Sequence, residues 1–86
     1  MPDPKYYEAL RAEIIRRLRE ERLRRKLSNY AVSQNCGVSE SMLSLVERGL
    51  RNPTLELALR IADGMGVNLE DVLKQARTTV SKRKVK

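Results

Sequence analysis

The segment from Leu27 to Gly49 constrains the fold of this chain more than any other part of its sequence. Ser28 and Ser39 each stand just before an expected short helix, where a side-chain oxygen can accept hydrogen bonds from free backbone amides. Gly37 follows the first of these helices and Gly49 follows the second, in positions where helices often end on a left-handed residue. Two capped helices with so short a connection predict a helix-turn-helix unit.

Apolar residues recur at helical spacing along the rest of the chain, and neither a strand pattern nor an internal repeat is present. Asp3 before Pro4 is a typical helix start, and the step from Asn52 to Pro53 favours an extended break. The sequence therefore predicts an all-α fold with an extended first helix. The five expected helices run from about Pro4 to Arg25, Asn29 to Asn35, Glu40 to Arg48, Leu55 to Met65, and onward from the capping residue Asn68.

We expect one domain over residues 1–77, followed by a basic tail over residues 78–86 that has no apolar face to bury and stays disordered. The inward face of the fourth expected helix is Leu55, Ala58, Leu59 and Ala62, and that of the fifth is Leu69, Val72 and Leu73. Leu57 and Ile61 form a second apolar stripe on the fourth helix. This stripe fits self-association and packing against the first helix equally well.

The net charge of +7 is unevenly distributed along the 86 residues. Residues 1–27 have a balance of +4, residues 28–73 a balance of −3, and residues 74–86 a balance of +6. A basic protein favours a polyanionic partner, and the second helix of a helix-turn-helix unit can enter the major groove of double-stranded DNA. The positive charge flanks that unit, so the tail is expected to add non-specific phosphate contacts.

Composition argues against several other functions. The chain has no His, and its single cysteine, Cys36, is expected to be a core residue, so we expect neither an enzyme nor a metal site nor a cofactor. No apolar run approaches the roughly 18 residues of a membrane span. The start of the chain has no signal-peptide pattern. These features predict a cytoplasmic protein without membrane contact.

The ordered set of motifs resembles the Cro/CI-type (Xre-like) helix-turn-helix family. The matching residues are Leu18, Arg19 and Arg22, LS at Leu27–Ser28, GVS at Gly37–Ser39, ERG at Glu47–Gly49, NP at Asn52–Pro53, and the ending IADGMGVNLEDVL. The resemblance spans roughly Ile15 to Leu73. It implies a compact five-helix bundle of the lambda-repressor-like type and sequence-specific DNA binding, often in transcriptional repression.

The resemblance also implies roles for individual residues. Those facing base edges would be Glu40, Ser41, Ser44 and Leu45; those contacting phosphates would be Arg19, Asn29, Ser39, Arg48, Arg51 and Asn52. Arg22 and Glu47 would form an internal ion pair. Two positions depart from the family pattern: Glu40 and Leu45 stand where Gln, Arg, Asn, Lys or Thr is usual. Asn29, in addition, is one methylene shorter than the usual Gln.

Two functions fit these residues. The first is a transcriptional regulator, a repressor acting as a homodimer on a two-fold symmetric site, with helix 40–48 in the major groove. The second is a protein-interaction or antitoxin-like module that uses the same fold, with a partner such as a toxin, since Glu40 and Leu45 also suit a protein surface. The charged run from Arg16 to Lys26 is otherwise interpreted as a solvated helix face with pairs such as Glu20–Arg24 and Glu21–Arg25.

Overall fold

Helix boundaries in this protein coincide with capping side chains. The computed structural model describes residues 3–84, which contain the helices α1 (Pro4–Arg24), α2 (Asn29–Cys36), α3 (Glu40–Glu47), α4 (Leu55–Met65) and α5 (Leu69–Lys84). Ser28, Ser39 and Thr54 cap α2, α3 and α4, each accepting a hydrogen bond of 3.0 to 3.1 Å from a backbone amide. The prediction of an all-α fold with five helices and a long first helix is confirmed.

The helix ends fall into two kinds. Gly37 ends α2 with a φ of 74°, a left-handed conformation that glycine adopts without a steric cost. At the end of α1 the left-handed residue is Lys26, with a φ of 58°. There the Leu27 amide donates to the Arg22 carbonyl and the Lys26 amide donates to the Leu23 carbonyl, both at 3.0 Å. This is the Schellman arrangement, with a lysine where glycine is usual.

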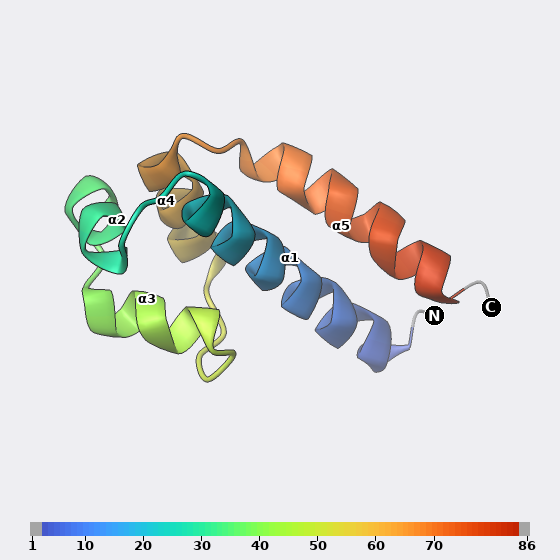
Figure 1. The fold of residues 1–86 in the computed structure, drawn as a ribbon. Coiled ribbons are helices and arrows are strands. Elements are labelled where there is room, and N and C mark those ends of the chain that lie inside the picture. The colour runs from blue at the N-terminus through green and yellow to red at the C-terminus, as the bar shows by residue number, and fades with distance from the viewer. Residues whose placement is uncertain (1–2, 85–86) are drawn as a thin grey trace.

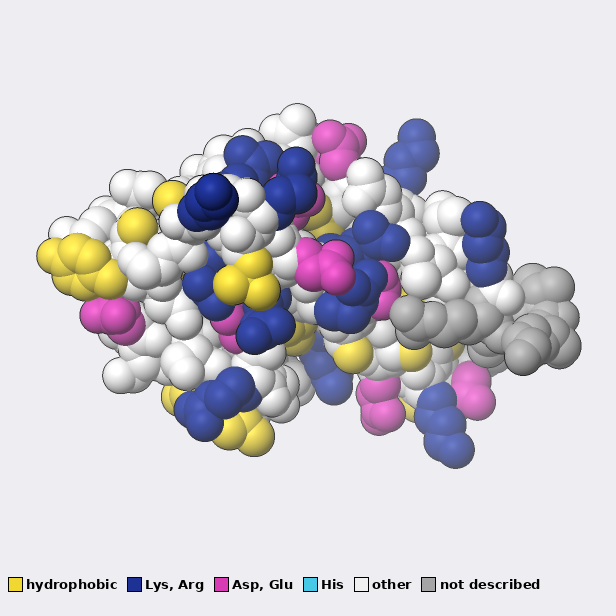
Figure 2. All heavy atoms as spheres, in the orientation of Figure 1, with side chains coloured by type: hydrophobic (Ala, Val, Ile, Leu, Met, Phe, Trp, Pro, Cys, Tyr) yellow, Lys and Arg dark blue, Asp and Glu magenta, His cyan; other side chains and the backbone are white. Residues whose placement is uncertain are grey.

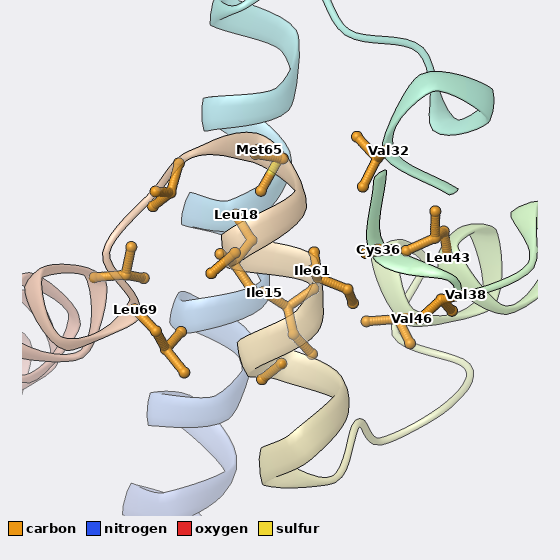
Figure 3. Close-up of a cluster of buried hydrophobic side chains, with 14 residues drawn as sticks. Ile15, Leu18, Val32, Cys36, Val38, Leu43, Val46, Ile61, Met65 and Leu69 are labelled. Atoms are coloured by element: carbon orange, nitrogen blue, oxygen red, sulfur yellow. The ribbon is translucent and has the colours of Figure 1, made fainter. Parts of the chain in front are cut away.

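The main core lies where α1, α2, α3 and α4 meet (Figure 3). Ala62 is fully buried and Val32 is 1% exposed, and both lie among aliphatic side chains from the other helices. The thiol-bearing Cys36 is buried in this cluster, as the sequence predicted. Leu69 and Val72 of α5 complete it, and Leu73 packs against it from the edge.

The inward face of α4 differs from the one predicted. Ala58 and Ala62 are buried as expected, but Leu55 and Leu59 are 69% and 43% exposed. The core instead takes Ile61, while Leu57 packs against it partly buried. The stripe of Leu57 and Ile61, for which the sequence left self-association and internal packing open, therefore packs inside the molecule. The prediction was wrong for Leu55 and Leu59 because the buried face of α4 is centred on Ile61 and Met65, and at about 100° per residue both leucines fall beyond the edge of that face.

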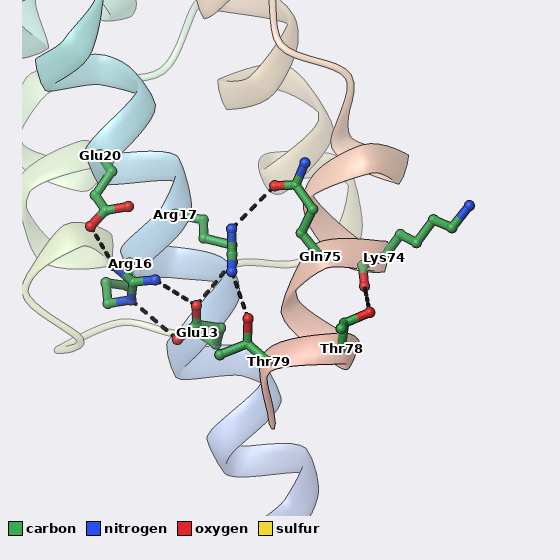
Figure 4. Close-up of polar contacts among 8 residues, drawn as sticks. All are labelled: Glu13, Arg16, Arg17, Glu20, Lys74, Gln75, Thr78 and Thr79. Carbon is green, nitrogen blue, oxygen red and sulfur yellow. Dashed lines mark hydrogen bonds and ion pairs between the residues drawn. The ribbon is translucent and has the colours of Figure 1, made fainter. Parts of the chain in front are cut away.

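The first half of α1 and α5 run side by side in opposite directions, and beyond the first turn of α5 they form an arm that extends from the body (Figure 1). The molecule is accordingly elongated, with extents of 40 × 21 × 18 Å. Leu10, Ala76 and Val80 make a second apolar cluster in this arm. Arg17 joins its two helices, donating to Gln75 at 3.1 Å and to Thr79 at 2.6 Å (Figure 4).

The structure contradicts the expected disorder of the tail for the residues that it describes. Residues 78–84 continue α5, and Val80 is only 3% exposed. Periodicity explains the difference: Leu69, Leu73, Ala76 and Val80 fall on one side of a helix, so the segment does have an apolar face, and the extended α1 covers it. Residues 85 and 86 of the predicted tail lie outside the described range. Residues 77 and 78 thus lie within one continuous helix.

Candidate nucleic-acid interface

The helix-turn-helix unit holds α3 with one side buried and the other free. Leu43 and Val46 are 2% and 3% exposed and face the core. The residues on the opposite side are Ser41, Ser44, Leu45 and Arg48, which recur at intervals of three and four and so form one stripe. Ser41 and Arg48 are exposed, and Ser44 and Leu45 are half-buried. This stripe is the surface that a helix in a DNA groove would present.

Glu40 lies beside this stripe, in the first turn of α3. Its side chain is exposed, and it forms no ion pair with any residue in the range 3–84. The position has a local advantage, because a carboxylate is favoured at the positive end of a helix dipole. The carboxylate of Glu40 therefore stabilises α3, independently of any contact with a partner.

The structure brings some of the predicted phosphate-contacting residues together. Ser39, Arg51 and Asn52 line a hollow of about 530 Å³ between the start of α3 and the loop that follows it. The Ser39 oxygen accepts from the Met42 amide at 3.1 Å, which leaves its hydroxyl proton free to donate outward. Arg48, at the other end of α3, donates from its Nε to the Ser44 carbonyl at 3.4 Å.

Arg19 and Asn29 lie away from that hollow. The Arg19 side chain is 54% exposed, and its Nε is 3.7 Å from Glu47 Oε1. Asn29 borders a small internal space together with Arg22 and Glu47. The Asn29 Oδ1 atom is buried and accepts no hydrogen bond from the described residues. The predicted set is thus split between the two sides of α3.

One cationic residue at the hollow was missed by the sequence interpretation. Arg60 of α4 lines it, and a nitrogen of its guanidinium lies 3.7 Å from the position that a Cβ on Gly37 would occupy. Glu56 pairs with Arg60 at 3.0 Å across one helical turn. In the sequence this spacing is typical of an ordinary surface pair. Only the folding of α4 against the turn at Gly37 places Arg60 beside Ser39.

The ion pair between Arg22 and Glu47 is present. The two side chains are only 13% and 17% exposed. The hydrogen bonds from Arg22 to Glu47 raise the pKa of the arginine above its ordinary value. Of the surface pairs expected on α1, Glu21–Arg25 forms at 3.3 Å, whereas Glu20 pairs with Arg16 in place of Arg24.

Cationic side chains are spread over the face of the molecule seen in Figure 2, interleaved with fewer acidic ones.

Within residues 3–84, no group of three or more His, Cys, Asp or Glu side chains is placed to hold a metal ion. None of the helices in the described range is both long enough and apolar enough to span a membrane.

Comparison with known proteins gives one match. Residues 18–72, from the second half of α1 into the start of α5, match a family model described as helix-turn-helix. No curated protein and no solved structure matches the chain. The matched range includes every base- and phosphate-contacting residue predicted from the sequence, and it excludes most of the α1–α5 arm.

Proposed function

Because the chain belongs to the Cro/CI/Xre-type helix-turn-helix family of DNA-binding transcription regulators, we propose that it represses transcription as a homodimer on a two-fold symmetric DNA site. In this proposal α3 of each copy enters the major groove, and the two half-sites lie about one helical turn apart. Bound across a promoter, the dimer blocks access of the transcription machinery. We place its action in the cytoplasm.

The outward stripe of α3 carries the proposal. Ser41 and Ser44 have hydroxyl groups that donate to or accept from base edges, and Leu45 can contact the methyl group of thymine. Glu40 can accept from the amino group of cytosine. With Leu43 and Val46 buried behind it, the stripe is held by the core and reaches the groove without reorganisation.

Phosphate contacts supply the attraction that these base contacts lack. Arg51, Asn52 and Ser39 line one hollow, and Arg60 adds a further cation there. Arg48 would grip the backbone at the end of α3, and Arg19 and Asn29 would do so at its other side. Such contacts fix the position of the protein on the duplex, and they make its affinity strongly dependent on salt.

A second function, a protein-interaction module of the antitoxin type, is favoured by one observation. The helix-turn-helix unit contains no Lys or Arg between Ser28 and Glu47. Glu40, on its exposed side, forms no ion pair with the residues that the structure describes. This surface would suit a basic protein partner such as a toxin. The two functions combine if the chain also controls the gene of that partner.

Fluorescence anisotropy with labelled duplexes separates the two functions. We expect the chain to bind the region upstream of its own gene, with an affinity that falls steeply with salt. Arg51→Ala should weaken binding to that duplex and to an unrelated one alike, and should reduce the salt slope by about one. Ser44→Ala should change the preference between duplexes and leave the slope unchanged. Absence of binding at low salt would favour the protein-interaction module.

A further inference from the structure

An apolar groove lies on the side of the molecule where α1, α4 and α5 meet. It encloses about 230 Å³ and is lined mainly by Leu10, Ile14, Leu55, Ala58 and Leu73. Among the described residues, Arg11 is the only charged one that lines the groove. Elsewhere the surface of this chain is dense in charge, so the groove is a place where contact with another apolar surface costs little desolvation of ions.

Two large apolar side chains project from the edge of the same groove. Leu55 is 69% exposed and Tyr7 is 51% exposed. A single exposed leucine is ordinary on a protein surface. A projecting leucine next to an apolar hollow is different, because the two together form a continuous patch.

We propose that a second copy of this chain docks on the groove, with Leu55 of each copy inserted into the groove of the other. A two-fold interface uses the same surface on both partners, so that surface must carry both the projection and the hollow. The face formed by Tyr7, Arg11, Leu55 and the groove meets this requirement. A different protein would need only the hollow.

The charges near the groove also favour a second copy of the chain as the partner that docks there. Two copies that each carry +7 repel one another, so an interface between them needs few like charges and some opposite ones. Arg11 forms no ion pair with the described residues, and neither does Glu70, an exposed carboxylate next to the groove-lining Leu69. In the proposed dimer, Arg11 of one copy pairs with Glu70 of the other.

The position of the groove agrees with the two-fold DNA site, and in this respect the inference rests on the proposed function. Pro53 and Thr54 border the groove and directly follow the loop of residues 48–52 at the end of α3. A copy docked there lies next to that loop. The two α3 helices then belong to one continuous assembly, as adjacent half-sites require.

Sedimentation equilibrium of the full chain without DNA tests the interface. We expect a dimer for the unaltered chain and at least tenfold weaker association for Leu55→Asp, which removes an apolar anchor but favours the first turn of α4 electrostatically. Tyr30→Asp is the matched control, since Tyr30 is 58% exposed in the first turn of α2 and lies outside the groove. It should associate like the unaltered chain.

A monomer at every concentration, or a Leu55→Asp dimer as tight as the unaltered one, would overturn the proposal. Arg11→Glu and Glu70→Arg should each weaken the dimer, and their combination should restore it; no restoration would overturn the Arg11–Glu70 contact. Because no DNA is present, these results are independent of DNA binding. A dimer that binds no DNA would refute the DNA-binding function and leave the interface standing. A monomer that binds DNA would refute the interface and the homodimer, and would leave DNA binding standing.

Discussion

Arg22 of α1 holds Glu47 of α3 through two hydrogen bonds, one from Nε to Oε2 at 2.6 Å and one from a terminal nitrogen to Oε1 at 2.9 Å. The remaining guanidinium nitrogen donates to the Leu27 carbonyl at 2.8 Å. One side chain thus connects α1, α3 and the loop that enters α2. This planar arrangement, in which each of the three guanidinium nitrogens donates one hydrogen bond, requires arginine and could not be reproduced by lysine.

Removal of Glu47 should destabilise the fold. Glu47→Ala leaves the largely buried Arg22 charge without its partner, and we expect a loss of about 2 kcal/mol in the free energy of unfolding. In a double-mutant cycle with Arg22→Ala, the double variant should lose clearly less than the sum of the two single losses. Urea denaturation measures all three values. Additive losses would show that the pair contributes no coupling.

Replacement of Lys26 by glycine should stabilise the protein. Lys26 holds a left-handed φ of 58° that costs a non-glycine residue about 1 kcal/mol, and glycine adopts it freely. We therefore expect Lys26→Gly to raise the urea midpoint by an amount equivalent to about 1 kcal/mol, with an unchanged m-value. Lys5→Gly, in the regular first turn of α1, is the control and should not stabilise. A lower midpoint for Lys26→Gly would contradict the Schellman ending.

Gly64 allows α2 and α4 to approach closely. A Cβ at this position would lie 2.9 Å from the Cβ of Cys36 and 3.4 Å from its backbone nitrogen. Although alanine is the better helix former, we expect Gly64→Ala to destabilise the fold by about 1–2 kcal/mol, because rigid atoms of α2 must shift. Thermal unfolding measures the effect. Asp63→Ala, at the exposed neighbouring position, should leave the melting temperature nearly unchanged.

Truncation after Arg77 should affect stability as well as DNA affinity. It removes Val80, which is buried against α1, and Thr79, which accepts from Arg17. We expect a loss of about 2 kcal/mol in unfolding free energy and weaker binding to all duplexes. A full-length variant with Gln at Lys82, Arg83, Lys84 and Lys86 should keep the stability and lose only the salt-dependent affinity. Equal stability of the truncated and unaltered chains would contradict the docking of the arm.

The sequence predicted the helix-turn-helix unit well because its boundaries depend on local chemistry. Ser28, Ser39 and Thr54 cap their helices through atoms only three residues away. The Arg22–Glu47 pair, although 25 residues apart, was accessible through the resemblance to a family. These features need no knowledge of how the helices pack.

Features that depend on packing could not be predicted in this way. Leu55 and Leu57 are both apolar residues on one helix, and only the folded arrangement decides which is buried: Leu57 lies beside Val38 and Met42, whereas Leu55 lies at the edge of the α1–α5 side and stays exposed. Residues 78–84 read as a charged tail because Val80 is their only large apolar residue, and its partner Leu10 lies 70 positions away in the sequence. Arg60 reaches the hollow beside Ser39 only through tertiary contact.

Selection of bound sequences from a random DNA pool tests the central claim, DNA recognition by α3, most directly. The account predicts enrichment of a two-fold symmetric site with half-sites about one helical turn apart. In the same selection, Ser41→Ala and Ser44→Ala should change the bases enriched within each half-site and leave the spacing unchanged. A pool that remains as diverse as the input, or identical sites for the unaltered chain and both serine variants, would contradict it.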